Sequence, residues 1–213
     1  MKLHLIAAAA LAAAATLPAH ALLVTDAGAI AGPTIAVDFE AFDGLLGSGP
    51  VAVAPGVVFS GDSGAELGAF IRDLGDNGAW GGIGNFAAGG VSGELRFTFT
   101  DGLSSGAGAF VSHYANAGLP FALAVEVSAY GDNHQIIETH SFTVGATFDA
   151  YNAGQFLGIT RTEADIRSIS FKGVGVVADN LVLTTPVPEA GTWAMMLAGL
   201  VAVGFVGLRQ RKA

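Results

Sequence analysis

Alternating apolar and polar residues predict β-strands along most of the chain between residues 34 and 183. In 94–100 the odd-numbered residues are apolar and the even-numbered ones are polar, the period-two pattern of a strand with one buried face. Segment 121–130 repeats this pattern, with Glu126 and Ser128 expected on the outer face. Further strands are expected at 34–39, 57–59, 107–112, 136–144, 155–160, 166–172 and 176–183.

The connections between these segments carry turn residues, and no long amphipathic helix is expected. Asp101-Gly102 and Gly131-Asp132-Asn133 are typical of turns. At 162–165 the Thr-x-x-Asp spacing resembles a capping box and predicts one helical turn. About nine strands joined by turns indicate an all-β protein, an antiparallel β-sandwich of the jelly-roll type.

The first 21 residues predict a secretory signal peptide. Lys2 supplies the positive charge, and an Ala-rich apolar stretch follows it. Ala19-His20-Ala21 is a cleavage site of the A-x-A kind, so signal peptidase is expected to leave Leu22 as the first residue. Residues 22–185 are then one exported domain, large enough to bury a core.

Residues 186–213 predict a membrane-targeting tail in three parts. The first is the motif Val187-Pro188-Glu189-Ala190, which prolines keep extended and open to a processing enzyme. The second is a transmembrane helix over 192–208, whose strictly apolar part spans about 24 Å against a hydrocarbon core of ~30 Å. The third is a basic stop over 209–213, which the positive-inside rule places in the cytoplasm. Its charged residues are Arg209, Arg211 and Lys212.

This order of short motif, short span and basic stop resembles the PEP-CTERM sorting signal of exported Gram-negative bacterial proteins. The matching residues are Pro188, Glu189 and Ala190, with Ala190 in place of the family's second proline. The resemblance implies that an integral-membrane exosortase cuts near the motif. It also implies that the inner membrane holds the protein only transiently, and that the sorting system accompanies exopolysaccharide production. A plain anchor that is never cut is the alternative interpretation.

The charge of residues 22–185 excludes one class of partner. All of the chain's 18 acidic residues except Glu189 lie in this segment, against five basic ones, so its formal charge is about −12. Such a surface repels phosphates, and no basic stripe is present, so we expect no nucleic-acid partner. The chain has no cysteine, and its stability must come from the core or from a metal rather than from disulfides.

Two acidic positions near the ends of this domain predict a calcium site. Glu40 follows the first predicted strand and Asp179 lies in the last, and the first and last strands of a sandwich often adjoin. Two close carboxylates repel each other, and Ca²⁺ prefers such oxygens together with backbone carbonyls. We therefore expect a structural Ca²⁺ at Glu40 and Asp179. The alternative is that Asp179-Asn180 form a turn or bulge and that Glu40 is solvated.

The domain also resembles exported jelly-roll domains with a sandwich like that of carbohydrate-binding modules. In several such families a structural calcium bridges the terminal strands, and the resemblance implies the same for this domain. The residues that carry the resemblance are Phe39-Glu40, Phe156-Leu157-Gly158-Ile159, Ile166, Ile169, Phe171 and Asp179-Asn180.

A glycine-rich stretch, 75–93, interrupts the strand pattern. It is either a long loop pinned by Trp80 and Phe86 or a ligand-facing loop in which Trp80 stacks on a sugar ring. Tyr130 is a second candidate for such stacking. The neighbouring segment 73–78 lacks the ligands of an EF-hand and predicts a plain turn.

The histidines indicate no catalytic or zinc site. No histidine pair of the mature domain has the spacing of a zinc site, while Glu138 and His140 are expected on one face of a strand. A Ser-His-Asp triad can be drawn from Ser112, His140 and Asp132, but no nucleophile elbow accompanies it.

The sequence therefore predicts a non-catalytic protein of the cell surface, extracellular matrix or biofilm that exosortase processes, with exopolysaccharide as a partner. A carbohydrate-binding module and a secreted hydrolase are the alternatives. Export across the inner membrane is common to all three.

Overall fold

A computed structural model describes residues 21–42, 44–69, 86–89, 93–113, 122–145 and 154–185 of the 213-residue chain. The predicted signal peptide before Ala21, the tail, Trp80 and the turn at 73–78 lie outside these ranges. Across the described ranges, no helix has both the length and the apolar character needed to cross a membrane. The helical element found there is the 3-10 turn η1 (Ala27–Ala29), which Asp26 caps.

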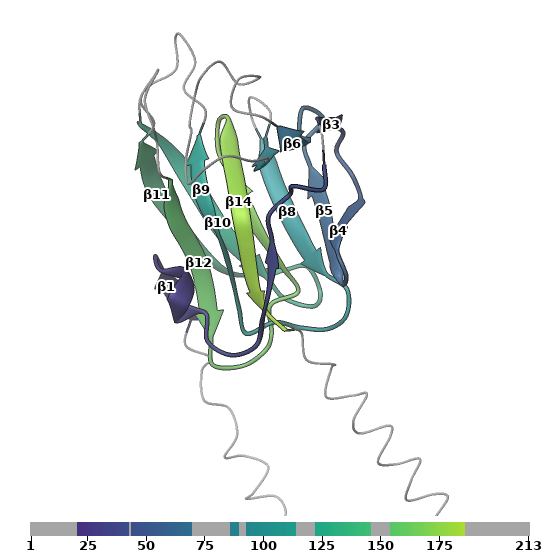
Figure 1. The fold of residues 1–213 in the computed structure, drawn as a ribbon. Coiled ribbons are helices and arrows are strands. Elements are labelled where there is room, and N and C mark those ends of the chain that lie inside the picture. Colours follow the sequence, from purple (N-terminus) through teal and green to yellow (C-terminus); the bar gives the residue numbers. More distant parts are fainter. Residues whose placement is uncertain are drawn as a thin grey trace, which may run out of the picture.

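Two antiparallel sheets pack face to face and form a sandwich (Figure 1). The eight-stranded sheet has the order β1-β12-β9-β14-β7-β6-β3, with β2 also paired to β14, and the six-stranded sheet has the order β11-β10-β13-β8-β5-β4. The strands of the first half are β1 (Ala21–Val24), β2 (Thr34–Val37), β3 (Leu45–Leu46), β4 (Val51–Ala54), β5 (Val57–Gly61), β6 (Glu66–Ala69) and β7 (Phe86–Ala88). Those of the second half are β8 (Glu94–Phe99), β9 (Gly106–His113), β10 (Ala122–Tyr130), β11 (Ile136–Gly145), β12 (Gln155–Arg161), β13 (Ser168–Lys172) and β14 (Val176–Thr184).

Nested strand pairs identify the topology as a jelly roll. The innermost pair is the β10–β11 hairpin, around which β9 pairs with β12, β8 with β13 and β7 with β14. Successive pairs alternate between the two sheets, as they do when one long hairpin wraps around a barrel-like core. The predicted fold class is therefore confirmed.

The core follows the predicted alternation. The burial of β8 alternates along its length, and Leu95, Phe97 and Phe99 have no exposed surface. The ring of Phe97 lies 5.6 Å from the rings of both Phe39 and Phe59 and 6.4 Å from that of Phe171, so aromatic side chains join segments from the first and the last part of the domain. Such ring pairs add to the area burial that stabilises the sandwich.

Glycine at 158 permits a close strand approach that no other residue allows. Gly158 faces Gly108 across the β9–β12 pair. A Cβ at Gly158 would lie 2.8 Å from the carbonyl oxygen of Ala107 and 3.1 Å from the Cα of Gly108. The space is used by Phe156, whose ring packs edge-on against Phe110 at 5.5 Å. The Phe156–Ile159 motif is thus a packing motif in this domain.

Three local features differ from what the sequence predicts. Residues 162–165 form a bend rather than a helical turn, and Asp165 pairs with Arg161 instead. Ser128 lies on the same face of β10 as Glu126, but only 1% of it is exposed, and its hydroxyl lies 2.8 Å from that of Thr139. The short strands β1, β3, β4, β6 and β7 were not predicted, since they lack a periodic pattern long enough to recognise.

Candidate functional sites

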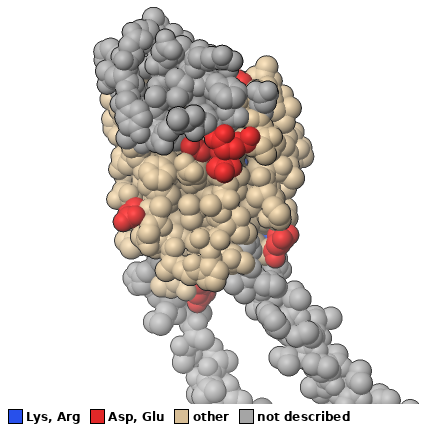
Figure 2. Space-filling model, viewed as in Figure 1, with Lys and Arg blue, Asp and Glu red and all other residues tan. Residues whose placement is uncertain are grey.

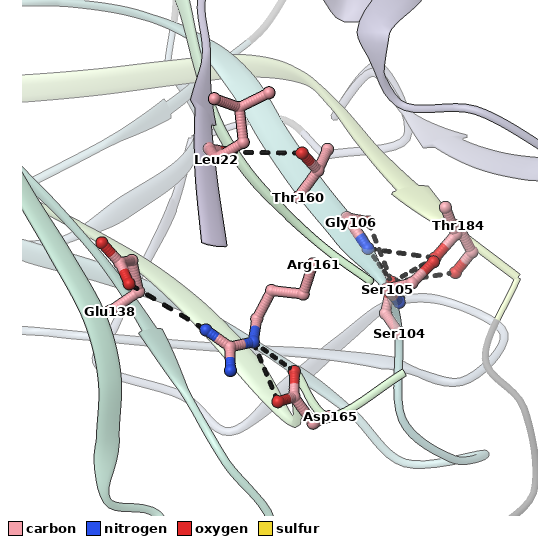
Figure 3. Close-up of polar contacts among 9 residues, drawn as sticks. All are labelled: Leu22, Ser104, Ser105, Gly106, Glu138, Thr160, Arg161, Asp165 and Thr184. Atoms are coloured by element: carbon pink, nitrogen blue, oxygen red, sulfur yellow. Dashed lines mark hydrogen bonds and ion pairs between the residues drawn. The ribbon is translucent and has the colours of Figure 1, made fainter. Parts of the chain in front are cut away.

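A buried hydroxyl cluster fastens the end of the last strand to the rest of the domain (Figure 3). Thr184 Oγ1 lies 2.6 Å from Ser104 Oγ and accepts hydrogen bonds from the backbone N–H groups of Ser105 and Gly106 at 2.9 and 3.2 Å. Ser104 is fully buried and Thr184 is 8% exposed. We call Ser104, Ser105 and Thr184 the hydroxyl clamp. It satisfies backbone donors of the turn into β9 and so holds β14 in place.

Both ends of the described domain lie at the end of the sandwich that carries the clamp (Figure 1). Thr185 donates its backbone N–H to the carbonyl oxygen of Pro33 at 2.8 Å, and its hydroxyl donates to the same oxygen at 3.1 Å. Ala21 pairs with Arg161, whose backbone N–H donates to Ser105. The segments that lead to the predicted signal peptide and tail therefore start from one side of the domain.

A charged network beside the clamp connects the two sheets (Figure 3). Arg161 of β12 binds Asp165 through Nε at 2.6 Å, and its Nη1 lies 3.9 Å from Glu138 of β11. The carboxylate of Glu138 in turn lies 2.8 Å from His140 Nε2, so the prediction that these two residues share a face is confirmed. Only 9% of the Arg161 side chain is exposed, so solvent and salt screen this ion pair less than a surface one.

Asp179, one of the two predicted calcium residues, lies in an irregular part of β14 beside the end of β2. Val37, the last residue of β2, pairs with Leu181, and the β9–β14 register shifts between Asp179 and Val182. Asn180 has a positive φ of 46°, and Asp179 Oδ1 accepts its backbone N–H at 2.7 Å. The bulge that the sequence offered as an alternative is therefore present. Figure 2, drawn from the same side as Figure 1, shows acidic side chains gathered in one group near the middle of the face that it presents.

Among the described residues, Asp179 has the pKa that departs most clearly from its ordinary value. The pKa of Asp179 is raised from 3.8 to about 6, chiefly by burial and in smaller part by the negative charges of Glu40 and Asp38, against the lowering effect of the hydrogen bond from the Asn180 N–H. The negative charge of Glu40 thus acts on Asp179, while a shared role of the two residues at a metal stays a prediction. A cation there would relieve the repulsion.

Calcium itself stays a prediction. Among the described residues, no three His, Asp or Glu side chains come together in an arrangement that would hold a metal ion. Two carboxylates fit only part of the six to eight oxygens that Ca²⁺ prefers, so Glu40 and Asp179 would need backbone carbonyls or waters as further ligands.

The outer face of the six-stranded sheet has a pocket of about 470 Å³. Its lining mixes hydrogen-bond donors and acceptors from β5, β8 and β13 and the turn after β5. The lining residues are Ser60, Gly61, Asp62, Glu94, Arg96 and Lys172. The sequence did not predict this site, because its lining comes from three separate segments, 60–62, 94–96 and 172, which only strand pairing brings together.

Arg96 is held rigidly at this pocket. Its guanidinium binds Glu94 Oε1 at 2.7 Å and lies 3.9 Å from the centre of the Tyr130 ring, a cation–π contact. Tyr130 is only 9% exposed, so its proposed role as a platform for sugar stacking is wrong: Arg96 occupies the ring face that a sugar would need.

The triad drawn from the sequence does not assemble. Ser112 is fully buried in β9. Asp132 binds Arg167 Nε at 2.9 Å rather than His140, and His140 has Glu138 as its acidic neighbour. Each of the three residues therefore has a structural environment of its own.

Comparison with known proteins identifies the tail. Residues 186–212 match the PEP-CTERM protein-sorting motif, directly after the last residue of the described domain. The protein is thus a jelly-roll β-sandwich with a sorting signal. The motif implies export, processing by exosortase, and transient membrane anchoring followed by a surface location. No curated protein matches the chain.

Two solved structures resemble the chain at low identity. A DUF4465 family protein from Bacteroides caccae is 8% identical with a TM-score of 0.43, over 80% of this chain and 100% of its own. A family 11 carbohydrate-binding module from Clostridium thermocellum, in complex with a β-1,3-1,4-mixed-linked tetrasaccharide, is 13% identical with a TM-score of 0.30, over 75% and 99%. At these values neither likeness bears on the ligand or activity of this chain.

Proposed function

We propose that the protein is a non-catalytic component of the cell surface, the extracellular matrix or a biofilm, released from the inner membrane by exosortase. The observation that carries this proposal is the PEP-CTERM motif at 186–212, placed directly after a folded domain that ends at Thr185. The domain is then the cargo of the sorting system, and an associated exopolysaccharide is its expected partner. The structural partners of Asp132 and His140 favour a non-catalytic role for these two residues.

Mass analysis of the surface-located protein tests the processing part of this proposal. We expect Leu22 as the first residue and no residue after about Ala190. Intact Met1 would contradict export through signal peptidase, and an attached Leu208 would show that the tail is an ordinary anchor. Matrix association is tested separately by the share of the protein that co-purifies with exopolysaccharide in wild-type cells and in cells unable to make the polymer.

The pocket on the six-stranded sheet favours a second function, carbohydrate binding. Its volume lies in the range of small-ligand sites. Sugar hydroxyls donate and accept hydrogen bonds at once, and the pocket offers acceptors in Asp62 and Glu94 and donors in Arg96 and Lys172.

A glycan array with the 22–185 domain separates the two functions. A matrix scaffold without a specific site should show no selective ligand, whereas a carbohydrate-binding module should. Any hit should be weakened by Lys172→Met, which removes a donor, and not by Glu163→Gln, an exposed carboxylate in the β12–β13 connection outside the pocket lining. Hydrolysis of the bound glycan would instead favour a secreted hydrolase.

A further inference from the structure

The fixed position of Thr185 limits how far the sorting motif can move from the folded domain. The hydroxyl clamp holds Thr184, and two hydrogen bonds to Pro33 hold Thr185. Glu189 lies four Cα–Cα steps beyond Thr185, and a fully extended chain covers at most about 14 Å over that length. An enzyme that grips the motif must therefore work within about 14 Å of the sandwich.

We propose that the clamp end of the sandwich docks directly on the membrane-embedded processing enzyme while the tail is cut. This inference rests on the exosortase processing proposed above. The surface consists of the connections β8–β9, β12–β13 and β10–β11, which bind one another at this end. Ser104 and Ile166 exchange backbone hydrogen bonds, and Arg167 binds the carbonyl oxygens of Phe99 and Gly102.

The charges of this end favour the enzyme over lipid as the contact. Asp101 and Glu163 are exposed, whereas the cations nearby are withdrawn: the side chains of Arg161 and Arg167 are 9% and 13% exposed and each binds a carboxylate. An anionic lipid surface would repel such an end. The enzyme surface that fits it presents positive charge and hydrogen-bond donors.

Docking of the domain makes the cut a two-point recognition, in which the domain raises the effective concentration of the motif at the enzyme. The effective concentration falls roughly as the −3/2 power of tether length. A tether of 14 Cα–Cα steps in place of four should therefore lower the effective concentration of the motif about sixfold.

The test measures the rate of tail removal in a host that carries the processing enzyme. Pulse-chase labelling of the full chain gives this rate. Ten Gly/Ser residues inserted between Thr185 and Pro186 should slow the cut about sixfold. The same insertion at the exposed Ser63–Gly64 turn should leave the rate unchanged. An unchanged or faster cut after the Thr185 insertion would overturn the proposal, because the domain would then be irrelevant or obstructive.

A charge variant tests the surface without lengthening the tether. Glu163→Lys should slow the cut about threefold, the size of a rim-charge effect on association, whereas Glu126→Lys on the β10 face should not. Equal rates for the two variants would overturn the proposed contact. If the wild-type tail is never removed, the processing itself fails; if it is removed but the variants behave like the wild type, only the docking fails.

Discussion

Thr184 Oγ1 and Ser104 Oγ lie 2.6 Å apart, although 80 positions separate them in the sequence. The Thr184 hydroxyl also accepts hydrogen bonds from the backbone N–H groups of Ser105 and Gly106. The pair connects the last strand to the turn before β9, at the point where the sorting motif begins.

The first prediction concerns the stability that this clamp provides. Thr184→Val keeps the shape of the side chain but removes the acceptor of the Ser105 N–H and the hydroxyl partner of Ser104, so the free energy of unfolding should fall by about 1–3 kcal/mol. Urea unfolding of the 22–185 domain measures the change. Thr143→Val, at an exposed position of β11, is the matched control and should change stability by less than about 0.5 kcal/mol. Equal effects of both variants would argue against the clamp.

The second prediction concerns the pH dependence caused by Asp179. Its pKa in the folded state is about 6, above the ordinary 3.8, so the folded state binds the proton more tightly than the unfolded state does. Stability should therefore be favoured at low pH and should fall as pH rises from about 4 to about 6. Ionised Asp179 costs the folded state about 1–2 kcal/mol at neutral pH once solvent screening is allowed for.

Urea unfolding between pH 4 and pH 8 checks this effect. Asp179→Asn keeps an oxygen that accepts the Asn180 N–H, so it should flatten this part of the profile and stabilise the domain at neutral pH. Glu163→Gln, which removes an exposed carboxylate, should keep the wild-type profile. A profile of Asp179→Asn that parallels the wild type would refute the assignment.

The third prediction is that calcium stabilises the domain at neutral pH through Glu40 and Asp179. Binding to the folded state alone adds about 2.7 kcal/mol at a hundredfold excess over Kd. Thermal melts with calcium and with chelator should differ by several degrees at pH 7, and the difference should shrink at pH 5, where Asp179 is mostly protonated. Asp179→Asn should abolish it. Superimposable wild-type melts would count against the site.

The fourth prediction concerns the processing motif. Glu189→Ala, or deletion of the basic stop 209–212, should leave uncut precursor in the membrane fraction, because the first change removes the motif's carboxylate and the second removes the orientation signal. Immunoblots of membrane and released fractions measure the distribution. Gly199→Ala, inside the apolar run, is the control and should be processed normally. Normal release of Glu189→Ala would contradict motif-directed cleavage.

Local patterns in the sequence determined much of the architecture. The alternation in 94–100 predicted β8 and its buried face, and turn residues separated the later strands. The tail was recognisable because its motif, apolar run and charges are contiguous, and contiguous signals need no knowledge of the fold. The bulge at Asp179-Asn180 was foreseen as one of two outcomes, because a short polar pair inside an apolar strand commonly interrupts pairing.

Only the tertiary structure decided which distant residues meet. Strand pairing placed Lys172 and Ser60 beside Arg96 to form the pocket, and it covered Tyr130 with the Arg96 guanidinium. It also brought Thr184 to Ser104 and put Ala21 and Thr185 at one end of the sandwich. The physical reason is that alternation specifies which face of a strand is buried but not which strand lies beside it. Neighbours in a jelly roll are chosen by the packing of the whole core.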